Sequence, residues 1–224
     1  MDDDALIREA LRVYRRYQLE VVEGLDLCPW AERARREGRV SERVLLQPHS
    51  ALEPSLAAIQ ELAAAPELEI GLLIYPRLTL DYAEFDRFVA AIRQGDEQNW
   101  PLGEVPFAAA TFHPGAVRSG EEPERLVPSI RRSPDPTIQL VRRSVLERMR
   151  QGPAEGTHFI DLQSFSFEQL PRPDQRPLRE RVARANAETL KRVGLPAFDR
   201  IIADIRRDRD ESYARLGEAA SPWS

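Results

Sequence analysis

The sequence predicts one α/β domain with a mostly parallel sheet of three to four strands, flanking helices and a helical C-terminal extension. Short apolar runs alternate along the chain with longer segments of helical periodicity, and this order is typical of right-handed crossovers between parallel strands. The length of 224 residues suits a single domain, and a hydrophobic fraction of 42% is enough for a globular core. We expect the domain to cover residues 1–216, with a proline-rich linker at 168–177 inside it and a frayed tail at 217–224.

The first third of the chain predicts a helix, a strand and a second helix. Apolar residues recur at helical spacing from the N-terminus, so the first helix is expected to end near Gly24. Residues 39–46 are predicted as a strand, which Pro48 ends. Residues 55–65 are rich in alanine and leucine, and they predict a helix.

The middle of the chain predicts two further strands with a helix between them. Residues 69–75 form an apolar run that is typical of strands buried on both faces. Asp81 is the expected N-cap of the helix that follows. Residues 105–112 form the third predicted strand, which stops at His113.

The last third is predicted to be mainly helical. An Asp-Pro pair has the form of an N-cap with proline at the first helical position, so a helix is expected at about 135–150. A fourth strand would lie at 157–161. Glycine and proline within 194–196 separate the two final predicted helices, at 178–193 and 197–216.

Composition and charge exclude several classes of protein. The formal net charge of −5 argues against a general nucleic-acid binder. No apolar stretch has the length of a membrane span, and the acidic start is unlike a signal peptide. Because Cys28 is the single cysteine, no internal disulfide can form. We therefore expect a cytoplasmic protein whose partner is a small anionic ligand, not nucleic acid or a membrane; the sequence indicates no oligomeric state.

Candidate site residues lie just past the predicted strands. Ligands of parallel α/β sheets bind beyond the carboxyl ends of the strands, where this chain has His49, Arg77 and His113. A fourth strand at 157–161 would add Asp161.

His113 is the best placed of the three histidines. It follows a strand with three consecutive alanines and precedes a Pro-Gly turn, so it could act as a general base, a ligand or a hydrogen-bond donor. It could equally cap the strand end, with its ring bonded to the backbone. His49 and His158 lack comparable surroundings and are expected to be structural. No His-x-x-x-His or Cys-x-x-Cys pattern predicts a metal site.

Cys28 lies directly before the start of a predicted helix. Unpaired backbone N–H groups and the helix dipole would favour a thiolate there, which is the form that acts as nucleophile or soft metal ligand. The alternative is a small buried apolar residue, the commoner role of a free cysteine. The pair Cys28-Pro29 also occurs where a thiolate binds haem iron, so haem is a further, weakly indicated cofactor.

Two arginines predict an anion site. Arg132 and Ser133 come directly before the predicted helix at 135–150, where unpaired N–H groups can bind an anion. Arg142 interrupts the apolar stripe of that helix, and it needs either a carboxylate or an anionic ligand. Asn186 is a polar residue inside a helix whose amide could contact a loop or a ligand. An ion pair within the protein is the alternative for the arginines.

Four short motifs occur in a recognisable order. They are LCPWA at 27–31, FHP at 112–114, RSP at 132–134 with a proline two residues on, and N-x-x-T-L-x-x-x-G at 186–194. Together, over roughly residues 10–195, they resemble an uncharacterised family of bacterial proteins known only as a domain of unknown function. The resemblance implies that Cys28, His113, Arg132 and Asn186 occupy signature positions and share a site, but it implies no activity.

The sequence also departs from the pattern of that family. The family tends to have Asn-Arg-Ser-Pro-Tyr-Pro followed by a Leu-His-Leu helix, whereas this chain has Arg131, Asp135 and Gln139 at the differing positions. If the histidine contributes to the family's chemistry, this member is altered or inactive. The proline-rich stretch and the long final helix resemble additions to the family's domain.

These observations support three hypotheses. The first is an enzyme that acts on a small anionic metabolite, with Cys28 as nucleophile or ligand and His113 as base. Arg132 and Arg142 would clamp the anion, assisted by Ser133 and Asn186. The second is a non-catalytic protein that binds haem, a metal ion or an anionic ligand. The third is an interaction module in which these residues only support the fold.

Overall fold

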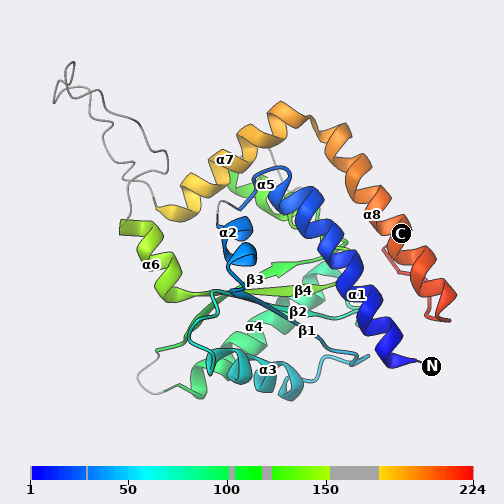
Figure 1. The fold of residues 1–224 in the computed structure, drawn as a ribbon, viewed down its shortest axis with the longest axis horizontal. Helices are drawn as coiled ribbons and strands as arrows, with labels where there is room; N and C mark the ends of the chain where they lie inside the picture. Colours follow the sequence, from blue (N-terminus) through cyan, green and yellow to red (C-terminus); the bar gives the residue numbers. More distant parts are fainter. Residues whose placement is uncertain (1, 29, 101–103, 118–122, 152–176, 224) are drawn as a thin grey trace.

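A four-stranded sheet lies between two layers of helices (Figure 1). The computed structural model describes residues 2–28, 30–100, 104–117, 123–151 and 177–223. Its strands are β1 (Val40–Val44), β2 (Ile70–Ile74), β3 (Phe107–Phe112) and β4 (Thr137–Arg142), and their order in the sheet is β1-β2-β4-β3.

The sheet is mixed, so the prediction of a mostly parallel sheet was wrong. β1 pairs with β2 in parallel, as expected for strands joined by a helical crossover. β4 is inserted between β2 and β3 and runs antiparallel to both. The three strands predicted from the sequence, β1, β2 and β3, therefore run in the same direction. Only β4, which was not predicted as a strand, runs in the opposite direction.

That strand lies in the segment predicted to begin a helix. The apolar stripe predicted for a helix at 135–150 combined residues of two elements: the strand β4 and the helix α6 (Arg143–Gln151) that follows it. In β4, Ile138 and Leu140 face one side of the sheet, while Gln139 pairs with Leu72 and faces the other. Because both faces of β4 are covered, Ile138 and Val141 are both buried although they lie on opposite faces, and their spacing of three residues resembles that of a helix.

The helices α3 (Glu53–Ala63) and α4 (Tyr82–Gln98) cover one face of the sheet. Asp81 caps α4 as predicted, since its side chain accepts a hydrogen bond from the Glu84 N–H while the Glu84 side chain accepts from the Asp81 N–H. Buried Phe85, Phe88 and Ile92 then pack towards the sheet.

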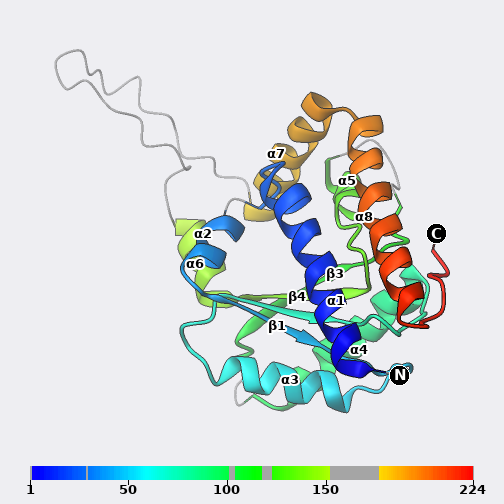
Figure 2. The ribbon, with the colours of Figure 1, turned by 45° about the vertical axis from the view of Figure 1, so that its right-hand side comes forward.

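The remaining helices cover or flank the opposite, inner face. Within this layer, α1 (Asp3–Tyr17) runs side by side with α8 (Leu195–Arg215) (Figure 2). Arg12 and Arg16 of α1 form ion pairs with Asp208 of α8. The elements are α1 (Asp3–Tyr17), the π-helix η1 (Gln18–Glu23), α2 (Ala31–Arg36), α5 (Pro123–Ile130), α6 (Arg143–Gln151), α7 (Leu178–Val193) and α8 (Leu195–Arg215).

The final residues of the chain contact the folded domain. In the segment predicted to fray, Glu218 pairs with Arg77 at 2.7 Å, and the Trp223 ring lies 4.9 Å from the His113 ring. The fourth strand predicted at 157–161 and nearly all of the linker predicted at 168–177 fall outside the described residues. Among the helices described, none has the length and apolar character needed to cross a bilayer.

Candidate functional site

One end of the sheet brings several of the predicted residues together. The carboxyl end of β3 and the amino end of β4 meet there, because Phe112 pairs with Thr137, and the carboxyl end of β2 lies beside them through Ile74. His113 and the segment 131–136 therefore lie at this end. Their side chains, however, have different surroundings.

His113 is fully buried and uses both ring nitrogens within the protein. The Gly115 N–H donates to Nδ1 at 3.0 Å, so Nε2 carries the proton and donates to the Leu80 carbonyl, also at 3.0 Å. The rings of Tyr82, Phe85 and Trp223 surround it. Burial lowers the pKa of His113 to about 4, so the imidazole is neutral near pH 7. This geometry favours the strand-capping role over that of a general base.

Cys28 and His113 lie on opposite faces of the sheet. Side chains alternate along a strand, so Phe112 points to the inner face while the next residue, His113, contacts Phe85 on the other. Cys28 packs with the inner-face core. The structure does not pair the predicted nucleophile with the predicted base.

The thiol of Cys28 is influenced by two opposing effects. The N–H groups of Trp30 and Ala31 donate to the sulfur and favour the thiolate, as expected at a helix start. Burial among apolar neighbours favours the protonated thiol, and it dominates, raising the pKa of Cys28 to about 12. Near neutral pH the side chain is an uncharged thiol.

Alkylation of Cys28 by iodoacetamide is therefore expected to be slow in the folded protein. Raising a thiol pKa from 9.0 to about 12 lowers the thiolate fraction near pH 8 by about a thousandfold. The rate, followed by mass spectrometry, should increase by that order when urea unfolds the chain. A rate in the folded protein equal to that of a free cysteine would contradict this account.

Arg132 and Ser133 both interact with other groups of the protein. Arg132 donates from Nε to the Ser129 carbonyl at 2.9 Å, pairs with Asp199, and stacks over the Phe198 ring at 5.0 Å. Ser133 is buried, and its hydroxyl donates to the Asp135 carbonyl at 2.6 Å.

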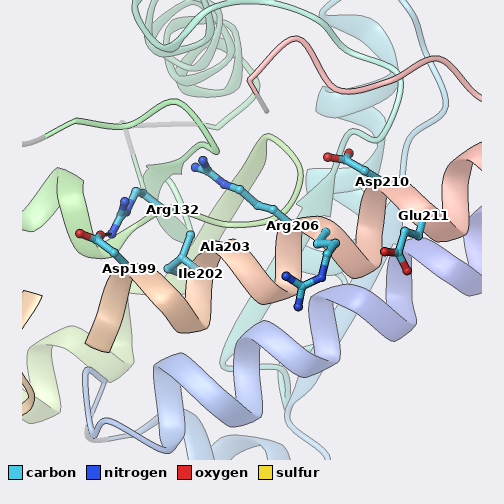
Figure 3. Close-up of a pocket in the computed structure, with 8 residues that line it drawn as sticks. Arg132, Asp199, Ile202, Ala203, Arg206, Asp210 and Glu211 are labelled. Carbon is cyan, nitrogen blue, oxygen red and sulfur yellow. Dashed lines mark hydrogen bonds and ion pairs between the residues drawn. The ribbon is translucent and has the colours of Figure 1, made fainter. Parts of the chain in front are cut away.

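A groove of about 440 Å³ runs along α8 beside Arg132 (Figure 3). Its three arginines are balanced by three acidic residues, so it provides no excess positive charge for an anion. The lining residues are Arg132, Asp199, Ile202, Ala203, Arg206, Arg207, Asp210 and Glu211.

Arg142 lies at the far end of β4 from Arg132. Because the segment is a strand, five residues of rise place Arg142 roughly 17 Å from Thr137. Its Nε donates to the Leu68 carbonyl at 2.6 Å, and its Nη2 donates to the Ala65 carbonyl at 2.8 Å, just past the end of α3. The predicted helix would have allowed Arg132 and Arg142 to share a space, whereas the strand separates them, and the structure does not bring the two guanidinium groups together.

Asp135 is the centre of a buried ionic cluster and not a helix cap. Arg209 of α8 donates from Nε to one carboxylate oxygen at 3.0 Å, and the Tyr213 hydroxyl donates to the other at 2.7 Å. The side chains of Asp135 and Arg209 are 0% and 4% exposed, respectively. Arg209 also donates to the Pro76 carbonyl at 3.1 Å. α8 is thereby fastened to the end of the sheet.

Arg131 differs from these arginines because its guanidinium has no polar partner among the residues that the structure describes. It lies over the Phe112 ring at 5.4 Å, and Tyr17, Tyr82 and Cys28 are close enough to interact with it electrostatically. Within the described residues it makes no ion pair and no side-chain hydrogen bond. Burial lowers the pKa of Arg131, which shows that the cation is poorly solvated.

Other polar groups of the inner layer are also unsatisfied. Gln18 is 5% exposed, and its Oε1 has no donor; Trp30 is 8% exposed, and its Nε1 has no acceptor. Gln139 and Asn186 make no side-chain hydrogen bond among the residues that the structure describes. Buried polar groups are normally satisfied, so Gln18, Trp30 and Asn186 are candidate ligand contacts, whereas Gln139 is only partly buried.

A metal or haem centre receives little support from this arrangement. No group of three or more His, Cys, Asp or Glu residues that could hold a metal ion occurs in the described part of the chain. His113 could coordinate iron only if one of its two backbone hydrogen bonds were broken. The haem alternative stays a prediction.

The anion was predicted at Arg132, one residue away from the arginine that lacks a partner in the described part of the chain. Arg131 belongs to the same Arg-Arg pair as Arg132, but nothing in the sequence shows which of the two has an acidic partner. Gln18 and Gln139 line the same small cavity because α1 continues into η1 and because 137–142 is a strand. Recognising that strand would have placed Gln139 on the inner face.

The fold and site define an α/β protein with a mixed four-stranded sheet and, in the part of the chain that the structure describes, an arginine that lies over an aromatic ring without an ion-pair partner. The chain belongs to the family described as Protein of unknown function (DUF1415), whose model matches residues 10–158. This confirms the resemblance to an uncharacterised family; the match includes Cys28, His113 and Arg132, whereas Asn186 lies beyond it. No curated protein and no solved structure matches the chain.

Proposed function

We propose that the protein binds a small anionic ligand through the guanidinium of Arg131. The observation that carries this proposal is the absence of a carboxylate or hydrogen-bond partner for Arg131 among the described residues, although the cation is partly buried. An arginine in such surroundings requires an anion, because a poorly solvated and unpaired charge is costly.

The chemistry of the arginine indicates the kind of ligand. A guanidinium has five N–H donors in a plane, and two of them can bind a carboxylate or phosphate together. The Arg131 guanidinium lies over the Phe112 ring, and none of its N–H groups donates to a residue that the structure describes. The net charge of −5 supports a small anion over nucleic acid. The single cysteine favours a reducing compartment, consistent with the cytoplasm.

The geometry supports binding better than covalent catalysis. A nucleophilic mechanism needs a thiolate and a nearby base, whereas Cys28 is protonated and His113 lies on the other face of the sheet. Cys28 instead borders Arg131 as an uncharged neighbour. The enzyme hypothesis stays a prediction, and the alkylation experiment above bears on it.

Thermal unfolding in the presence of simple anions tests the proposal. Formate, acetate, phosphate and sulfate would be compared at constant ionic strength. A ligand at a hundredfold excess over its dissociation constant stabilises the fold by about 2.7 kcal/mol, so at least one anion should raise the melting temperature.

Matched arginine variants locate the effect. Arg131→Met should abolish the increase, while Arg132→Met removes the same charge from the neighbouring residue and should preserve it, because Arg132 is already paired with Asp199. Melting temperatures that no anion raises, or an increase that survives in Arg131→Met, would refute the proposal.

A further inference from the structure

A pocket of about 240 Å³ lies on the face of the sheet that α3 and α4 cover, beside the edge strand β3. Its apolar lining includes Ile92, Phe107 and Leu140, which belong to the core on that face. Arg131 lies over Phe112, whose side chain belongs to the inner face, so this pocket is separate from the proposed anion site. Pockets for drug-sized ligands measure roughly 300–1,000 Å³, so this one suits a smaller molecule, about the size of a single amino acid.

Asp96 of α4 is a buried carboxylate that lines this pocket. It is 4% exposed, and its Oδ1 accepts a hydrogen bond from Trp100 Nε1 at 2.9 Å. Its Oδ2 has no hydrogen-bond partner among the residues that the structure describes. Burial raises the pKa of Asp96, because the carboxylate is poorly solvated. A buried carboxylate with one free oxygen is costly, and a ligand ammonium would satisfy both its charge and its second acceptor.

Two arginines give the same pocket positive charge. Arg143, the first residue of α6, makes no side-chain hydrogen bond or ion pair with a described residue, and its planar donors can bind a carboxylate. Arg93 donates to the Ala109 carbonyl of β3 at 3.1 Å and adds a second cation. Asp96 and Glu97 balance these two charges. Such a pocket suits a ligand that itself carries both a positive and a negative group.

We infer that this pocket binds an α-amino acid with an apolar side chain, whose ammonium pairs with Asp96 while its carboxylate pairs with Arg143. The Arg143 N–H donates to the Pro106 carbonyl at 2.8 Å, which holds this arginine beside the start of β3. The apolar side chain of the ligand would then lie against Phe107 and Leu140. An amine without a carboxylate would leave Arg143 unpaired, and an acid without an ammonium would leave the buried Asp96 unpaired.

Calorimetric titration of the full chain with leucine, 4-methylpentanoate and 3-methylbutylamine tests the inference. The acid has the leucine skeleton without the ammonium, and the amine has it without the carboxylate. Leucine should bind at least about tenfold more tightly than either analogue, because each analogue lacks one charge-assisted hydrogen-bonded pair.

Matched variants locate the site. Asp96→Asn keeps the shape of the side chain and an acceptor for Trp100 but removes the charge, so it should lower leucine affinity to about that of 4-methylpentanoate. Asp86→Asn is the control: Asp86 is exposed on the same helix and accepts from Thr111, so this variant should bind leucine as the wild type does. Arg143→Met should lower leucine affinity to about that of the amine.

The outcomes separate this inference from the proposed function. Equal affinities for leucine and either analogue, or a leucine affinity that survives Asp96→Asn, would overturn the inference. No binding of leucine at millimolar concentrations would also overturn it and assign the free oxygen of Asp96 to water. Arg131→Met should bind leucine as the wild type does, even if no simple anion stabilises the protein. Leucine binding that is lost in Arg131→Met and kept in Asp96→Asn would place leucine at Arg131 and overturn only the present inference.

Discussion

Replacing Arg209 by leucine is expected to lower the free energy of unfolding by about 3–5 kcal/mol, the range for a buried ion pair that loses one partner. The substitution leaves the Asp135 carboxylate, which is 0% exposed, with the Tyr213 hydroxyl as its only side-chain donor among the described residues. It also removes the hydrogen bond to the Pro76 carbonyl and the stacking of the guanidinium on the Tyr213 ring at 4.1 Å.

Urea denaturation followed by circular dichroism would measure this change. Arg207→Leu is the matched control: Arg207 lies on the same helix and pairs with Asp204, but both side chains are exposed, so the loss should stay below about 1 kcal/mol. Combining Arg209→Leu with Asp135→Asn removes the unpaired charge and should recover part of the stability. If Arg207→Leu and Arg209→Leu lost similar amounts of unfolding free energy, the buried cluster would contribute no more stability than an exposed ion pair.

Acidification is expected to destabilise the protein through His113. The pKa of His113 is lowered from 6.5 to about 4 by burial, so between these values the unfolded chain binds a proton that the folded chain does not. Stability from this residue is therefore fully present above pH 6.5 and is lost as the pH falls to about 4. The loss corresponds to about 3 kcal/mol, at 1.36 kcal/mol for each pKa unit.

The difference between two pH profiles isolates the contribution of His113. Free energies of unfolding of the wild type and His113→Gln would be measured from pH 7 to pH 4. The wild type should lose more stability than the variant across this interval, whereas exposed His49→Gln should keep the wild-type profile. Parallel profiles for the wild type and His113→Gln would contradict the assigned protonation state.

Local signals in the sequence predicted most of the elements. The Asp81 capping box, the apolar run of β2 and the Gly-x-Pro boundary before α8 each depend on residues that are close in sequence. Whether the sheet is parallel or mixed is decided by the segment 137–142, which forms a strand paired with β2 and β3. Such pairing joins residues that are far apart in sequence, so the local apolar pattern did not reveal it and was interpreted as a helix.

The candidate site was predictable only in part. Short motifs identified the family. Cys28 was predicted directly before a helix, and α2 begins three residues later, at Ala31, with the N–H groups of Trp30 and Ala31 reaching the sulfur. The burial that outweighs them comes from elements distant in sequence. Likewise, Arg131 and Arg132 look equivalent in the sequence, and only the approach of Asp199 from α8 distinguishes them.

The side-chain Nε–Hε signals of the arginines in a nitrogen–proton NMR spectrum test the central claim most directly. Arg131→Met would assign the signal of Arg131 by its disappearance, and glycolate and phosphate would be titrated into the wild type. The account predicts that the Arg131 signal shifts and saturates, while those of Arg132 and Arg142, already bonded to protein groups, stay in place. A stationary Arg131 signal, or equal shifts of all three, would contradict a ligand site at Arg131.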